Sequence, residues 1–230
     1  MRAIVLAGGL GTRLRARVPD LPKVMAPVGG RPFLEHVLDR LIAGGIENVI
    51  LSLSYKAAMV TNHFGPMYKG VALSYAIEEQ PLGTGGAVVY ALKNRGAAPA
   101  LVLNGDTLLD MDYGEFVVWY ARMPTRVAMV LRKMPDVARY GTVLASQGVV
   151  TGFAEKGKTG PGLINAGVYV VRPEVFESYG LSGKFSFETD LLQPHCRMLR
   201  PRAYITDAYF IDIGVPEDYE RAQSELRQGA

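Results

Sequence analysis

Residues 1–23, MRAIVLAGGLGTRLRARVPDLPK, place a short apolar run directly before a cluster of glycines and cations. Residues 3–7 are apolar at every position, which predicts a buried strand of a parallel sheet. The next segment contains three glycines that permit a tight turn and leave backbone N–H groups open to a ligand: Gly8, Gly9 and Gly11. This order of features predicts a phosphate-binding loop at the carboxyl end of a strand.

Polar side chains beside this loop suit a polyphosphate, since they supply a hydroxyl and two fixed positive charges: Thr12, Arg13 and Lys23. A Walker A motif does not fit, because Gly11 is followed by Thr-Arg rather than by Gly-Lys-Ser/Thr. A dinucleotide-binding fingerprint fits poorly as well. Leu14 stands where a third small residue is needed, and residues 52–54 lack the acidic side chain expected at the end of the second strand. A glycine-rich turn without a ligand remains the alternative.

Composition favours a single intracellular α/β domain. The chain has 230 residues, 49% of them hydrophobic, which is enough for one large core without a second domain. A net charge of +3 is too small to indicate nucleic acid as a partner. Cys196 is the only cysteine, so no intrachain disulfide can form, and a reducing cytoplasm is expected. No signal peptide or membrane-spanning run is apparent, and we expect no membrane partner.

The periodicity of apolar residues predicts a Rossmann-like, mostly parallel mixed sheet flanked by helices, in one domain. A strand at 3–7, a helix at 31–44 and a strand at 49–53 form a right-handed βαβ unit. Further helices are expected at 56–64, from about 87, and at 113–123, 174–178, 186–192 and from Pro216 onward; further strands are expected at 73–77, 100–103, 127–131, 149–153, 163–171 and 209–213.

Two further loops fall on the expected ligand edge of the sheet. Residues 78–86 lie between a strand and a helix, and their glycines would let a flat ring lie against the backbone. An ordinary flexible connection is the alternative interpretation of the same residues. Asp106 follows the strand at 100–103, where a carboxylate can hold Mg²⁺ together with substrate phosphates. Asp212 could supply a second carboxylate. Each aspartate could instead be structural, as a cap or a turn residue.

Taken together, LAGGLGTRL with Pro22-Lys23, PLGTGGA, LNGD, FAEK, INAGVYV and IDIGVPEDY resemble the motifs of the sugar-1-phosphate nucleotidyltransferases. The resemblance covers essentially the whole chain and implies the nucleotide-diphospho-sugar transferase fold. It also implies a nucleotide-binding half at about 1–110 and a sugar-phosphate-binding half at about 111–230. Within this family the sequence and spacing of the motifs are most similar to those of the D-glycero-D-manno-heptose 1-phosphate guanylyltransferases, followed by the mannose-1-phosphate guanylyltransferases. The hexapeptide-repeat domain that many relatives carry is missing, so their oligomerisation and regulation are not transferred, and a homodimer is left open.

The resemblance also implies roles for individual residues. The first loop would bind the nucleotide through Leu6, Ala7, Gly8, Gly9, Gly11 and Thr12, and its phosphates through Arg13 and Lys23. The base would lie against Glu78, Pro81, Gly83 and Thr84. Mg²⁺ would be held by Asp106 and Asp212. The sugar and its phosphate would contact Asn104, Gly141, Glu155, Lys156 and Asn165.

The implied reaction joins a sugar 1-phosphate to the α-phosphorus of a nucleoside triphosphate and releases pyrophosphate. A phosphate monoester is largely dianionic at neutral pH, so no general base is required, and the three histidines lie outside the loops above. A Glu78 carboxylate favours GTP, because its two oxygens match the adjacent N1–H and N2–H₂ donors of guanine. Glu79 competes for that role. A catalytically inactive nucleotide-sugar-binding subunit and an NAD-linked sugar-modifying enzyme are the alternatives from other classes.

Overall fold

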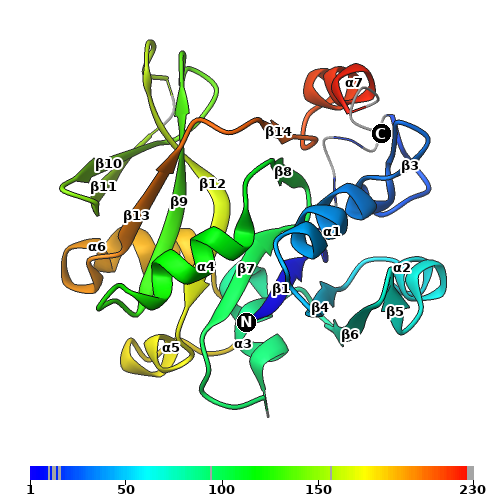
Figure 1. The fold of residues 1–230 in the computed structure, drawn as a ribbon, viewed down its shortest axis with the longest axis horizontal. Coiled ribbons are helices and arrows are strands. Elements are labelled where there is room, and N and C mark those ends of the chain that lie inside the picture. Colours follow the sequence, from blue (N-terminus) through cyan, green and yellow to red (C-terminus); the bar gives the residue numbers. More distant parts are fainter. Residues whose placement is uncertain (10, 12–13, 15–16, 94, 156, 227–230) are drawn as a thin grey trace.

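A central mixed sheet divides the computed structural model into two helical layers (Figure 1). The structure describes residues 1–9, 11, 14, 17–93, 95–155 and 157–226. Within these residues, ten strands form one sheet in the order β10-β11-β13-β9-β12-β7-β1-β4-β6-β5. Their bounds are β1 (Arg2–Leu6), β4 (Asn48–Leu53), β5 (Met67–Tyr68), β6 (Val71–Ile77), β7 (Ala100–Asn104), β9 (Val127–Met134), β10 (Thr142–Ser146), β11 (Val149–Ala154), β12 (Gly162–Val171) and β13 (Arg202–Thr206).

The first strand is buried on both faces, as its continuous apolar run predicts. β1 pairs in parallel with β4 on one side and β7 on the other. Ala3 and Val5 belong to the core on one face of the sheet, whereas Ile4 between them belongs to the core on the other face. Because successive strand residues point to opposite faces, a strand covered on both sides needs apolar residues throughout.

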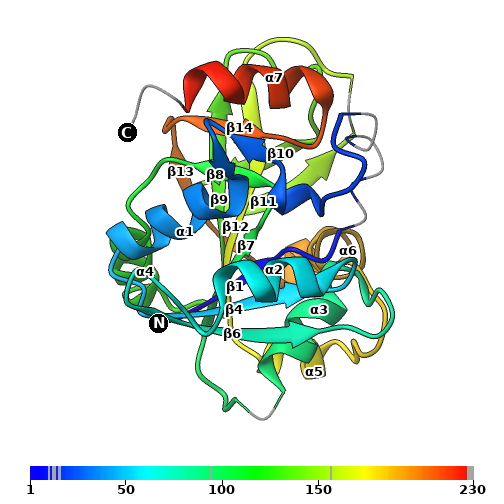
Figure 2. The same cartoon turned by 90° about the vertical axis from the view of Figure 1, so that its right-hand side faces the viewer.

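Helices cover both faces (Figures 1 and 2). One face is covered by α1 (Phe33–Ala43), α2 (Ala57–Phe64) and α4 (Tyr113–Ala121), and the other by α3 (Gly83–Leu92), α5 (Glu174–Ser178) and α6 (Gln193–Leu199). A π-helical segment, η2 (Phe187–Leu192), leads directly into α6. The expected fold class is confirmed. None of the described helices is long and apolar enough to cross a membrane.

The second half of the chain makes the sheet mixed. β12 runs antiparallel to both β7 and β9, while β13 runs parallel to β9. A separate ribbon pairs β8 (Thr107–Leu109) with β14 (Phe210–Asp212), and its register sets Asp212 opposite Thr107. This pairing places Asp212 opposite the residue that follows Asp106, although the two aspartates are far apart in sequence.

Some elements differ from the sequence prediction. α3 begins at Gly83 rather than near residue 87, so much of the expected loop is helical. Its glycines have a packing role: a Cβ at Gly85 would lie 2.1 Å from the Phe185 ring, and one at Gly86 would lie 2.2 Å from the Gly183 carbonyl oxygen. β8, β10, β13 and α6 were not predicted. They are only three to seven residues long, too short for a clear local periodicity.

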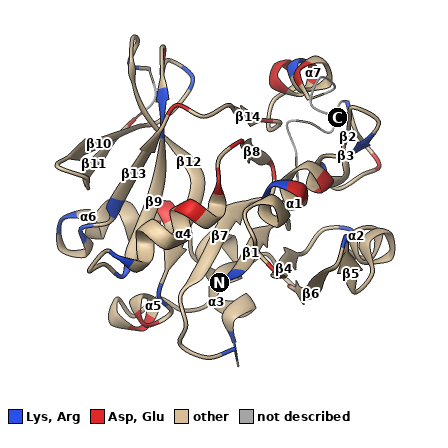
Figure 3. Ribbon diagram, in the orientation of Figure 1, with Lys and Arg blue, Asp and Glu red and all other residues tan. Residues whose placement is uncertain are grey.

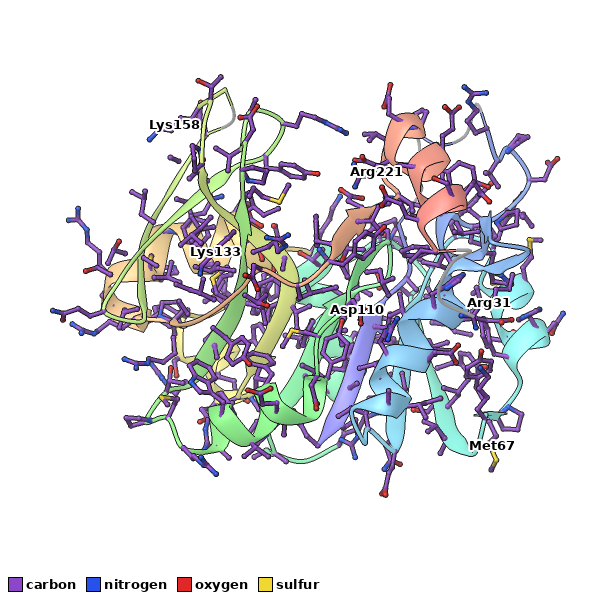
Figure 4. The ribbon with its side chains drawn as sticks, turned by 45° about the horizontal axis from the view of Figure 1, so that its top comes forward. Arg31, Met67, Asp110, Lys133, Lys158 and Arg221 are labelled. Atoms are coloured by element: carbon purple, nitrogen blue, oxygen red, sulfur yellow. The ribbon has the colours of Figure 1, made fainter. Side chains whose placement is uncertain are left out.

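Several contacts fix the last helix, α7 (Pro216–Glu225), which carries both acidic and basic residues (Figure 3), among them Arg221 (Figure 4). Asp218 is 2% exposed and forms ion pairs with Arg139, from the β9–β10 connection, and with Arg221 on the same helix. The Tyr219 hydroxyl donates to the carbonyl of Pro27, in β2 (Pro27–Val28), which pairs with β3 (Arg31–Pro32). Helix α7 therefore joins the chain beside Lys23 to the connection that precedes Gly141.

Two helices approach closely where Gly44, at the end of α1, meets Gly114 in the first turn of α4. A Cβ at Gly114 would lie 2.6 Å from the Gly44 carbonyl oxygen. Because this oxygen belongs to the backbone, it cannot move aside as a flexible side chain could. We expect Gly114→Ala to lower the free energy of unfolding by about 1–3 kcal/mol, despite the better helix propensity of alanine. Urea unfolding measures this change.

Gly152→Ala is the matched control. Its Cβ would meet only Leu144, at 3.7 Å, which is ordinary van der Waals contact. Equal unfolding midpoints for the two variants would show that the contact between α1 and α4 is not tight.

Candidate active site

A cavity of about 280 Å³ opens at the carboxyl ends of β1, β4, β6 and β7. The described residues that line it include eight of the predicted nucleotide contacts: Leu6, Ala7, Gly8, Gly9, Glu78, Pro81, Gly83 and Thr84. The Gly105 N–H donates to the Leu6 carbonyl at 2.8 Å, and a Cβ at Gly105 would lie 2.8 Å from that same oxygen. A glycine is therefore needed here for the Asn-Gly-Asp turn to lie against the first loop.

Lys23 joins the two aspartates at the cavity. Its ammonium nitrogen lies 2.5 Å from Asp106 Oδ2 and 3.7 Å from Asp212 Oδ1, and only 10% of its side chain is exposed. The segment that carries it, η1 (Lys23–Met25), is anchored by the buried side chains of Val24 and Met25. Three groups from distant parts of the chain thus form one cluster of a cation and two carboxylates.

Glu78 also lines this cavity, and two hydrogen bonds fix its carboxylate. It is 8% exposed, and its carboxylate accepts hydrogen bonds from the Ser52 hydroxyl at 3.1 Å and from the Leu82 N–H at 2.8 Å. Each oxygen keeps a further lone pair, so the carboxylate can still accept from a ligand. Glu79, the competing candidate, is exposed and is not among the residues that line the cavity.

A second cavity, of about 430 Å³, is lined by residues from the strand-rich half. Three of the predicted sugar contacts lie on it: Gly141, Glu155 and Asn165. The fourth described one, Asn104, lies on the first cavity instead. One lining residue of each cavity lies close to Gly167. The Gly167 N–H donates to Asn165 Oδ1, and a Cβ at Gly167 would lie 2.5 Å from the Asn104 amide nitrogen.

The second cavity also contains polar groups that sequence reasoning missed. Asn165 donates to the Tyr169 hydroxyl at 2.6 Å and to Glu188 Oε2 at 2.7 Å. Burial raises the pKa of Tyr169 above its usual range, and the Glu188 carboxylate adds to that rise, so the phenol stays protonated. Thr142 is 8% exposed and also lines this cavity. No sequence motif marks Glu188 or Thr142; only the packing of the chain brings them here.

Some predicted contacts have a different setting. Thr12, Arg13 and Lys156 lie outside the described residues. Gly11 is described and has a positive φ of 58°, and a Cβ there would lie 3.1 Å from Lys23 Cβ. It supports Lys23 and is not among the residues lining the cavity.

Asp106 and Asp212 are the carboxylates that could hold a divalent ion. Among the described residues no group of three or more His, Cys, Asp or Glu side chains could enclose a metal. Asp106 and Asp212, however, already converge on one cation, the Lys23 ammonium. Two carboxylates with an open side fit Mg²⁺, which usually takes its remaining ligands from water and substrate phosphates.

A comparison with family models matches residues 2–229 to the nucleotidyl transferase model. The chain belongs to the nucleotidyl transferase family. It is 43% identical to a D-glycero-α-D-manno-heptose 1-phosphate guanylyltransferase of Aneurinibacillus thermoaerophilus, over 99% of each chain. It is 44% identical to the enzyme of the same name from Campylobacter jejuni, over 95% of this chain and 97% of that one.

Solved structures agree with these sequence relatives. The fold of this nucleotidyl transferase superposes on HddC from Yersinia pseudotuberculosis, complexed with GMP-PN, with a TM-score of 0.85. The two are 37% identical, and the match covers 98% of this chain and 99% of that one. The predicted enzyme class, sugar-1-phosphate nucleotidyltransferase, is confirmed by the family and these relatives.

Gly214 provides a test of the cation–carboxylate cluster. A Cβ at this position would lie 2.6 Å from Asp212 Oδ1 and 2.8 Å from Lys23 Nζ. We expect Gly214→Ala to lower kcat by about 10- to 100-fold, because displacement of reacting groups by about 1 Å has effects of that size. Steady-state pyrophosphate release measures it, and thermal unfolding checks that the variant is folded. Gly152→Ala is the control, and wild-type turnover in both variants would contradict a role for the cluster.

Proposed function

We propose that this enzyme transfers a guanylyl group from GTP to D-glycero-α-D-manno-heptose 1-phosphate, giving the GDP-sugar and pyrophosphate. The observation that supports it most is the convergence of Asp106 and Asp212 on Lys23, where Lys23 and Asp106 line the first cavity and Asp212 lies beside them. The identity of 43% to a heptose 1-phosphate guanylyltransferase supports the choice of substrate. Residues 6–106 line the first cavity and residues 141–193 the second, which supports a nucleotide half and a sugar-phosphate half divided near residue 110.

The proposed chemistry needs no proton removal. An oxygen of the sugar 1-phosphate attacks the α-phosphorus of GTP, and the bond from that phosphorus to the oxygen bridging it to the β-phosphorus breaks. The attacking phosphate is already dianionic at neutral pH, and pyrophosphate leaves with the bond's electron pair. What the protein must supply is positive charge and alignment, because two polyanions meet.

Named groups can supply that charge. The backbone N–H groups of the first loop can hold the triphosphate, Arg13 can grip the leaving pyrophosphate, and Lys23 can neutralise oxygens at the α-phosphorus. Lys156 can orient the incoming phosphate. Mg²⁺, held by Asp106 and Asp212, would supply further positive charge to the reacting phosphates.

Glu78 is proposed to select guanine. Its carboxylate is immobilised by Ser52 and Leu82, and its remaining lone pairs can accept from the N1–H and N2–H₂ groups of the base. Uracil and thymine offer one ring N–H between carbonyl oxygens that would repel a carboxylate.

A panel of triphosphates and sugars tests the function. GTP, ATP, UTP and dTTP are each paired with heptose, mannose and glucose 1-phosphates, and pyrophosphate release is followed with and without Mg²⁺. We expect GTP with the heptose 1-phosphate to give the highest kcat/KM, and Glu78→Gln to raise the KM for GTP by about 10-fold or more. A pyrimidine preference would overturn the base assignment, and a mannose preference would overturn the sugar.

Lys23 provides a test of the charge argument. Lys23→Ala should lower kcat by about 10²-fold or more, since a preorganised cation is lost where negative charge develops. Lys69→Ala is the control. It removes an exposed lysine that pairs with Asp39, lines neither cavity, and is distant in sequence from the proposed catalytic residues. Near-normal turnover by a folded Lys23→Ala enzyme would show that this lysine is not part of the catalytic machinery.

A further inference from the structure

Asn165 has few groups left for a ligand. Both hydrogens of its amide are used, in the bonds to the Tyr169 hydroxyl at 2.6 Å and to Glu188 Oε2 at 2.7 Å. Its oxygen accepts from the Gly167 N–H at 3.0 Å. The resemblance to the family implied that this residue touches the sugar, but its amide donors are engaged within the protein. Its clearest effect is to hold Glu188.

The backbone beside Glu188 is anchored, whereas the Glu188 carboxylate can still accept further hydrogen bonds. The neighbouring residue Phe187 is 2% exposed, and its N–H donates to the Thr84 hydroxyl at 2.9 Å. Of the two Glu188 oxygens, Oε2 accepts from Asn165 and Oε1 has a long contact of 3.4 Å with the Gln193 amide. A carboxylate has about four acceptor sites, so two remain for a ligand in the second cavity.

The other polar groups of this cavity suit hydroxyl donors. Glu155 supplies a second carboxylate, and among the described lining residues there is no Lys, Arg or His. Thr142 is 8% exposed, and its buried hydroxyl has no hydrogen-bond partner among the described residues. A buried hydroxyl without a partner is costly, unless a ligand supplies one. Two carboxylates and an unpartnered hydroxyl are the complement of a polyhydroxylated molecule.

The number of carboxylates bears on which sugar fits. One carboxylate can accept from both hydroxyls of a vicinal diol, one to each oxygen. A hexose 1-phosphate in its ring form offers ring diols but a single exocyclic hydroxyl. A heptose 1-phosphate adds a vicinal diol outside the ring, at C6 and C7. Glu155 and Glu188 together therefore match a sugar with one diol on the ring and another beyond it.

We propose that Glu188, positioned by Asn165, binds the exocyclic diol of the sugar and selects a heptose over a hexose. This inference rests on the proposed function, because it assigns the sugar end of the same active site. Glu188 contacts substrate, Asn165 is a positioning residue that acts through it, and Thr142 contributes a further hydroxyl contact.

The test compares two sugars in matched variants. KM and kcat are measured with GTP and either heptose 1-phosphate or mannose 1-phosphate, for the wild type, Glu188→Gln and the control Glu177→Gln. Glu177 is an exposed carboxylate on α5 that lines neither active-site cavity. We expect Glu188→Gln to raise the KM for the heptose by about 10-fold or more and that for mannose by much less, with the KM for GTP and the unfolding midpoint unchanged.

Two outcomes separate the inference from the function on which it rests. A wild type that forms no GDP-sugar from any sugar 1-phosphate would refute the proposed function. A wild type that uses heptose 1-phosphate, with a Glu188→Gln variant that loses both sugars equally or neither, would refute the inference and leave the function standing.

Further variants test the remaining roles. If Asn165 acts through Glu188, Asn165→Ala combined with Glu188→Gln should be no worse than Glu188→Gln alone; multiplied effects would show that Asn165 contacts the sugar itself.

Thr142→Val keeps the shape of the side chain and removes its hydroxyl. It should leave the unfolding midpoint of the sugar-free protein unchanged or higher, while raising the KM for the heptose several-fold. A lower midpoint with an unchanged KM would assign Thr142 to stability alone.

Discussion

The contact of the Lys23 ammonium with two carboxylates holds the active site together before any substrate arrives. Asp106 and Asp212 lie close enough to meet the same cation, and without a positive charge between them they would repel each other. Lys23 supplies that charge from a third part of the chain, on a side chain that is only 10% exposed. The same requirement recurs in the proposed reaction, where positive charge must lie between negatively charged groups that would otherwise stay apart.

The rest of the fold serves to bring these three groups together. The parallel strands end in the loops that carry Gly8, Glu78 and Asp106 at one edge of the sheet, while the ribbon of β8 and β14 brings Asp212 alongside. Helix α7 then ties the segment after Lys23 to the connection before Gly141 through Tyr219 and the buried Asp218. The first and second cavities are therefore held in one frame by both strand pairing and helix contacts.

Features with a strong local signal could be predicted from the sequence. The buried strand β1 and its glycine loop follow from an unbroken apolar run and closely spaced glycines, and the closing helix from Pro216 and the acidic residues behind it. The placement of Asp106 beside Asp212 came from the resemblance and from strand ends, and their geometry agrees with it. Their roles as metal ligands remain a prediction.

Features that depend on distant packing could not be predicted in this way. The early start of α3 depends on Phe185 and Gly183 lying against its glycines, which no window of sequence reveals. The short strands β10 and β13 are stabilised by their neighbours rather than by a pattern of their own. Glu188, in η2, lies at the second cavity with its carboxylate hydrogen-bonded to Asn165 in β12, a contact that no window of sequence reveals.

The position of β12 has a consequence for the way the protein is made. Among the described residues, β7 pairs with β1 on one edge and, on the other, with β12, which is encoded much later. During synthesis on the ribosome, β7 therefore waits with an open edge until residues 162–171 have emerged, and an open edge invites pairing with other chains. The parallel strands of the first half of the chain are therefore completed as a sheet only when a strand from the second half pairs with β7.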